Sequence, residues 1–281
     1  MRLSHNLMSL NVYRNYTKNV GAQSKSMSKV SSGDKIGKAM DNPAGMGQRE
    51  QIRMQLRGIQ MSQRNMQDGI SMLQTVEGGL DNITTALNRV RELTISSGGA
   101  TTEDDRAVIQ KEIEQMLKSI DDIANNTEFN GVKLLAKTGT EPDHIKMASG
   151  ANVGDTLVIP ANNLTSGNLT NKEGTLSLKD IKVNEGKIDE ALGIIDGSMD
   201  KVLSIRSKYG AIQNRMESLY DIQGQNSLVM EGADSNIGDV DIAEEMMHLA
   251  KHNLLVEAGN AMMVQTNRMP QDVLRDRKSV V

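Results

Sequence analysis

Glu244, His248 and His252 are spaced four residues apart, so on a helix they would share one face. Two histidines at this spacing can bind zinc, but the hydrolytic zinc motif also needs a glutamate directly after the first histidine as the general base. Leu249 occupies that position. No third strong ligand is evident, so exposed polar residues on a helix explain the pattern better. The sequence predicts neither a metal site nor a cofactor.

Other residue patterns that could do chemistry are equally sparse. The chain has no cysteine and neither a Gly-x-x-x-x-Gly-Lys-Ser/Thr nor a Gly-x-Ser-x-Gly spacing, so it has no thiol nucleophile, P-loop or nucleophile elbow. No run approaches the roughly 18 apolar residues of a membrane span, and the first residues lack the apolar core of a secretory signal. We therefore predict that the protein is not an enzyme, does not enter a membrane and, if exported, keeps its N-terminus.

The net charge is distributed unevenly along the chain. Residues 1–64 hold eleven Lys and Arg against three acidic residues, a net charge of +8, whereas the remaining 217 residues sum to −12. Such polarity can steer subunits onto one another or attract an anionic polymer. Only Tyr13 and Tyr16 could stack on bases in the basic segment, so we expect no nucleic-acid binding.

Two long stretches, from residue 52 and from residue 188, carry apolar residues every seven positions. A seven-residue repeat is typical of helices that supercoil around a partner. Because the stretches lie far apart in sequence, they most simply bury their seams on each other, which predicts a long antiparallel coiled-coil rod. The expected rod core comprises Ile52, Ile59, Met66, Leu73, Leu80, Ile195, Val202 and Met216.

The composition supports a mainly α fold with a thin core. Aromatic residues make up 2% of the chain, whereas there are 19 methionines. A thick globular core normally needs aromatic bulk, while a helical seam can be filled by Leu, Ile, Met and Ala.

Helical spacing, turn residues and β-compatible runs predict the remaining elements. In order, these are a helix over 3–30, a loop over 31–47, a long helix over 48–96, a helix capped by Thr101 or Thr102, a small β-hairpin region over 129–185 with strands such as 156–159 and 175–178, a return helix over 185–230, a glycine-rich break over 232–238 and a final helix. We predict two domains. Residues 1–40 with 238–281 pair the N- and C-terminal helices, and 41–237 form the rod including the β region.

Both terminal helices carry apolar faces that the rod does not need for its own core. In a thin monomer these faces would be exposed, which is typical of a surface that finds partners. The expected subunit-packing residues are Leu3, Leu7, Leu10, Val20, Met247, Leu254, Ala258 and Met262. The sequence therefore favours an interaction function over catalysis.

Several short segments, spread from one end of the chain to the other, match segments found in one known protein family. They are MRLSHNLMSLN at 1–11, KVSSG at 29–33, DNPAG at 41–45, NMQDGIS at 65–71, TEFNG at 127–131, RSKYGAIQNR at 206–215, DVDIAE at 239–244 and PQDVL at 270–274. On these blocks the chain resembles bacterial flagellin over nearly its whole length. The charged ending RDRKSVV at 275–281 departs from the apolar pair that usually ends family members.

The resemblance implies a structural subunit that self-assembles into the helical filament of the extracellular bacterial flagellum and serves swimming motility. It implies export without a cleaved signal peptide, an export chaperone at the C-terminal segment, and filament cap and hook-junction proteins as further partners. Arg89, Leu93 and Glu112 match the patch through which the vertebrate innate flagellin receptor recognises the family.

The sequence leaves three alternative functions open. A hook–filament junction protein or a minor flagellin would share the terminal helices, although junction proteins typically carry larger central domains. A signalling helical hairpin of the chemoreceptor kind would also show antiparallel heptads, but it would need a membrane span. An enzyme would require metal bound through His248 and His252.

Overall fold

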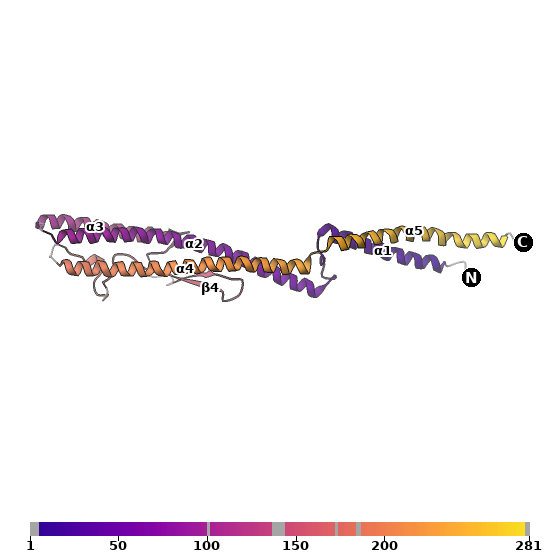
Figure 1. Ribbon diagram of the computed structural model, residues 1–281, viewed down its shortest axis with the longest axis horizontal. Coiled ribbons are helices and arrows are strands. Elements are labelled where there is room, and N and C mark those ends of the chain that lie inside the picture. Colours follow the sequence, from indigo (N-terminus) through magenta and orange to yellow (C-terminus); the bar gives the residue numbers. More distant parts are fainter. Residues whose placement is uncertain (1–5, 100–101, 137–143, 172–173, 184–186, 279–281) are drawn as a thin grey trace. The chain divides into compact units, whose positions relative to one another are not determined.

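Figure 1 shows the computed structural model, which describes residues 6–99, 102–136, 144–171, 174–183 and 187–278. The elements in order are α1 (Leu7–Ser32), α2 (Pro43–Ser97), α3 (Glu103–Asn126), β1 (Glu128–Phe129), β2 (Val132–Lys133), β3 (His144–Ala148), β4 (Thr156–Pro160), the 3₁₀ helix η1 (Leu178–Asp180), α4 (Ile188–Gly238) and α5 (Ile242–Lys278). The chain divides into a terminal unit, Met1–Met54 with Val229–Val281, and a central unit, Gln55–Leu228. The boundaries between the two units fall within α2 and within α4.

In the central unit, α2 and α4 run antiparallel, because the partners of α2 lie progressively earlier in α4. Arg206 pairs with Glu77 at 2.6 Å, and Arg91 pairs with Asp196 at 3.1 Å. Seven of the expected rod-core positions are buried here: Ile59, Met66, Leu73, Leu80, Ile195, Val202 and Met216. Ile52, the eighth, is half-buried and belongs to the terminal unit.

Helix α3 lies alongside α2 and completes the core of the central unit (Figure 1). Its N-terminus is Thr102, whose side chain accepts a hydrogen bond from the backbone N–H of Asp105 while the Asp105 carboxylate accepts one from the Thr102 N–H. This reciprocal cap satisfies two helix-end donors, as Thr followed by Asp three positions later predicts. Ile113 and Ile120 then face inward and are fully buried.

Two antiparallel strand pairs, β1 with β2 and β3 with β4, form the β region. The β3–β4 hairpin packs on the helices: Asn65 donates to the Ala148 carbonyl at 3.4 Å, and Gln223 donates to the Ser149 carbonyl at 3.2 Å. Tyr209 of α4 donates to the Pro160 carbonyl at 2.7 Å, and burial raises the pKa of its hydroxyl. The hairpin is therefore held to both long helices.

Two expectations about local structure are wrong. Residues 175–178 form no strand: Ser177 makes an isolated bridge to Thr170, and η1 begins at Leu178. Residues 232–238 do not break the return helix, since α4 continues through Gly238. Glycine in a helix costs only about 1 kcal/mol relative to alanine, which tertiary packing can offset.

The structure confirms a mainly α fold with paired terminal helices and two small strand pairs. In the part of the chain that the structure describes, no helix combines the length and the apolar character needed to cross a membrane.

Candidate functional site

The terminal unit is built on the antiparallel pairing of α1 with α5. Asn6, the N-cap of α1, donates to the Thr266 carbonyl at 2.9 Å, and Ser9 donates to the Asn267 side chain at 3.0 Å. Farther along, Gln23 bonds to Asn253. Polar side chains therefore contribute to the contact between the two helices, and none of their described apolar side chains is fully buried.

The expected subunit-packing residues lie on the surface of this unit instead of in its core. Six of them are exposed large apolar side chains: Leu7, Leu10, Val20, Met247, Leu254 and Met262. Their exposed fractions run from 70% for Leu7 to 37% for Val20. Ala258 is exposed as well, and Leu3 lies outside the described residues. Apolar surface on this scale is typical of a protein–protein contact. We call these seven described residues the apolar faces of α1 and α5.

A small polar cluster fixes α1 against α5 at the opposite end of the pair. Glu245 is buried on α5, and its carboxylate lies 3.6 Å from the Lys29 ammonium. A hydrogen bond from Ser26 lowers the pKa of the Glu245 carboxyl below its ordinary value; burial opposes this shift, and the charge of Lys29 adds to it. The ionised form of Glu245 is thus the one that stabilises the helix pair.

We expect Glu245→Gln to lower the free energy of unfolding of the terminal unit by about 1 kcal/mol at pH 7. Because the pKa of Glu245 is depressed in the folded state, its contribution is present above the ordinary pKa of 4.5 and is lost as the pH falls through the folded value. The difference between the variant and the wild type should therefore shrink as the pH falls below 4.5 and disappear below the depressed pKa. Urea unfolding over a series of pH values measures it. Glu244→Gln, at the exposed neighbouring position, is the matched control, and an equal loss in both variants would contradict the role of Glu245.

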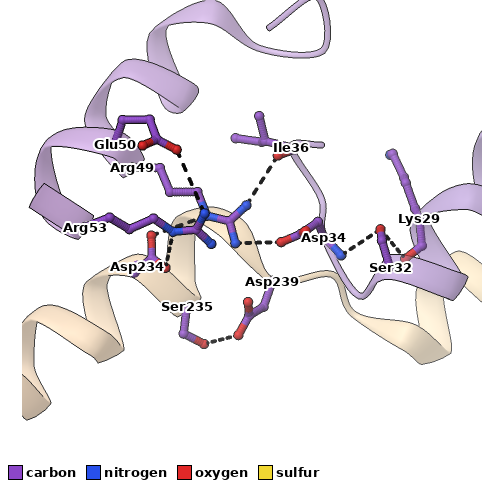
Figure 2. A network of polar contacts seen from close by, with 10 residues as sticks. All are labelled: Lys29, Ser32, Asp34, Ile36, Arg49, Glu50, Arg53, Asp234, Ser235 and Asp239. Carbon is purple, nitrogen blue, oxygen red and sulfur yellow. Dashed lines mark hydrogen bonds and ion pairs between the residues drawn. The ribbon is translucent and has the colours of Figure 1, made fainter. Parts of the chain in front are cut away.

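Arg49 organises the junction between the loop after α1 and the end of α4 (Figure 2). Its side chain is 7% exposed; it pairs with Asp34 at 2.6 Å, with Asp234 at 3.3 Å, and donates to the Ile36 carbonyl at 3.3 Å. Burial disfavours the charged guanidinium, but the carboxylates of Asp34 and Asp234 outweigh that cost and raise the pKa of Arg49. One cation thus holds the loop to α4.

Backbone contacts strengthen the same junction. The Lys35 N–H donates to the Gly238 carbonyl at 2.7 Å, and the Val240 N–H donates to the Gly33 carbonyl at 2.9 Å. Gly33 ends α1 in the left-handed conformation, with φ of 75°. A Cβ at Gly238 would collide with the guanidinium of Arg49, so a larger residue there would push that side chain away from its partners.

In the central unit, Arg89 of α2 pairs with Glu112 of α3 at 2.9 Å and with Glu92 at 3.2 Å. Hydrogen bonds from Arg89 to Glu112 and Glu92 raise the pKa of its guanidinium. Leu93 is 6% exposed, so of the three residues expected in the receptor patch only Arg89 and Glu112 present side chains to solvent.

The histidine helix face holds no ligand cluster. The Nε2 atom of His248 lies 3.8 Å from Glu244. Within the described residues, no three His, Cys, Asp or Glu side chains are grouped so that they could hold a metal ion.

Sequence reasoning missed Arg49, Ser26 and Asp234. Arg49 was one of eleven basic residues, and Asp234 lay in the expected helix break. The sequence did contain one signal for Arg49. It lies three residues before Ile52, where the apolar seven-residue repeat begins, and a charge placed beside an apolar seam needs a partner.

Comparison with known proteins identifies the family. The model described as the bacterial flagellin N-terminal helical region matches residues 3–140, and that of the bacterial flagellin C-terminal helical region matches 192–275. The chain is 37% identical to flagellin from Halalkalibacterium halodurans over 98% of this chain and 99% of that one, and 36% identical to flagellin from Bacillus subtilis with the same coverage. It is 34% identical to the flagellar filament 31.3 kDa core protein of Treponema maltophilum, again over 98% and 99%.

Solved structures are similar over part of the chain. Flagellin from Bacillus cereus is 33% identical, with a TM-score of 0.47 over 57% of this chain and 88% of that one. Flagellar hook-associated protein-3 from Legionella pneumophila is 15% identical, with a TM-score of 0.52 over 67% and 98%. The latter similarity is one of fold.

Proposed function

This chain belongs to the bacterial flagellin family and is a structural subunit of the extracellular flagellar filament, and we propose that the apolar faces of α1 and α5 carry its self-assembly. The observation that supports this proposal is the exposure of Leu7, Leu254 and their neighbours on helices that already pair with each other. Flagellins and a filament core protein match nearly the whole chain, so a filament subunit is favoured over a junction protein.

Burial of these faces against neighbouring copies drives assembly. Each fully buried Val, Leu or Met side chain contributes about 1.5–3 kcal/mol. The summed contribution of the six such side chains on these faces exceeds the lower estimates of the cost of lost translational and rotational freedom. The helix pair gains order when it enters the filament, because long amphipathic helices with mainly polar mutual contacts are marginally stable alone. Contacts between non-identical surfaces then propagate as an open helix.

We assign further binding partners to surfaces of the same subunit. Before assembly an export chaperone covers the apolar face of α5, and filament cap and hook-junction proteins contact the helix pair at the filament ends. Export leaves the N-terminus uncleaved, since α1 is itself part of the assembly surface. The vertebrate innate flagellin receptor contacts Arg89 and Glu112, which pair with each other at 2.9 Å.

The test is elongation of preformed filament seeds by full-length monomer, followed by electron microscopy. Leu254→Asp places a charge on the apolar face at an exposed position, so it should leave the helical content unchanged and reduce elongation by about tenfold or more. Val153→Asp, at the fully exposed tip of the β3–β4 hairpin, is the matched control and should elongate normally. Normal growth of Leu254→Asp filaments would refute the proposal.

A further inference from the structure

Two neighbouring depressions on the terminal unit are lined by lysines. They have volumes of 490 and 530 Å³ and share Lys25, Lys29 and Asp41. Lys35 lines the first depression and Lys38 the second. We call the two together the lysine depression.

The charges of this depression are only partly compensated. Lys25 pairs with Asp41 at 2.7 Å, and this pairing lowers the pKa of the Asp41 carboxyl. Lys29 is engaged by Glu245, and Asp34 is held by Arg49. Lys35 and Lys38 are exposed, and within the described parts of the chain their ammonium groups form no ion pair. The depression therefore carries an excess of positive charge.

The loop that carries Lys35 and Lys38 is held in place by its backbone. The Lys35 N–H donates to Gly238, the Lys38 N–H donates to the Asp41 carboxylate at 3.2 Å, and the Asp41 N–H donates to the Lys38 carbonyl at 2.9 Å. Little backbone freedom remains to be lost when an anionic partner binds.

The chain itself supplies a matching surface. Glu103, Asp104 and Asp105 are the only three consecutive acidic residues in the sequence. They form the exposed first turn of α3 in the central unit. The positive end of a helix dipole amounts to about half a charge, which three carboxylates outweigh. This turn is therefore a compact anionic projection.

We propose that the lysine depression of one copy receives the acidic first turn of α3 of a second copy. The inference rests on the proposed self-assembly and names a contact within it. Because the two surfaces differ, the contact is heterologous, which is the type of contact that an open helical filament is built from. Complementary charge also speeds the encounter of subunits, and added salt weakens that steering.

The test is a charge swap, read out as the critical concentration for assembly by sedimentation of the full chain. Lys35→Glu with Lys38→Glu should raise that concentration about tenfold, since two attractions become repulsions. Glu103→Lys with Asp104→Lys should do the same. The chain with all four substitutions should return close to the wild-type value. Lys146→Glu with Lys208→Glu, two exposed lysines of the central unit, controls for net charge.

Circular dichroism establishes that each variant keeps the wild-type helical content. If the wild-type chain itself fails to assemble, the proposed function is wrong. If it assembles and the lysine variant has the same critical concentration, the inference alone is overturned. A four-substitution chain as impaired as the double variants also overturns it, because the lysines then face some other surface.

Discussion

Replacing Arg49 with methionine is expected to lower the free energy of unfolding of the terminal unit by about 2–3 kcal/mol. Methionine fills a similar length but removes the charge and every donor, so Asp34 and the Ile36 carbonyl lose their partner. Removing one member of a buried pair costs about 3–5 kcal/mol, and the value here is smaller because Asp34 is partly exposed. Urea unfolding followed by circular dichroism measures the change.

Arg53→Met is the matched control. Arg53 shares Asp234 with Arg49 at 3.2 Å, but its side chain is 38% exposed, so its loss should cost well under 1 kcal/mol. Amide hydrogen exchange at Lys35 and Val240, whose N–H groups bridge the junction, should accelerate in Arg49→Met and not in Arg53→Met. Equal stability of the two variants would show that burial of Arg49 contributes nothing beyond an exposed ion pair.

The sequence predicted the long helices because their signal is local. A seven-residue repeat of apolar side chains is visible within a single stretch, and it led directly to α2, α4 and the buried side chains of Met66, Leu73 and Val202. The cap at Thr102 was predictable for the same reason, since its partner Asp105 is three residues away.

The junction could not be predicted from local patterns. Arg49 lies 15 residues from Asp34 and 185 from Asp234, and only the folded chain brings these groups together. Gly232 suggested a helix end on its own, yet α4 continues to Gly238, where the missing side chain makes room for Arg49. Tertiary packing outweighed a weak local preference there.

For the terminal helices, the sequence predicted part of the arrangement and missed the rest. Their spacing predicted apolar faces on both helices, and Leu7, Leu10 and Leu254 are each exposed on the surface of the unit. The polar cluster of Ser26, Lys29 and Glu245 was not foreseen, because nothing in a single helix indicates which serine will be buried against a carboxylate.

Leu80→Ala is expected to lower the free energy of unfolding of the central unit by about 3–4 kcal/mol. Leu80 is fully buried in the core that α2, α3 and α4 share. The loss combines the transfer free energy of the deleted methyl groups with the cost of a cavity that three packed helices cannot close. In a unit of this size, thermal unfolding should shift downward by about 6–16 °C.

Leu203→Ala provides the comparison, since Leu203 is the same residue type on the facing helix α4 but is 47% exposed. Its removal leaves no enclosed cavity, so the change should stay within about 0.5 kcal/mol. Because Leu80 lies far from the apolar faces in sequence and in a different unit, Leu80→Ala should weaken the subunit without abolishing seeded growth below its melting temperature. A variant that kept wild-type stability would mean that the heptad seam relaxes around the deletion, and the core assigned from the seven-residue repeat would then be loosely packed.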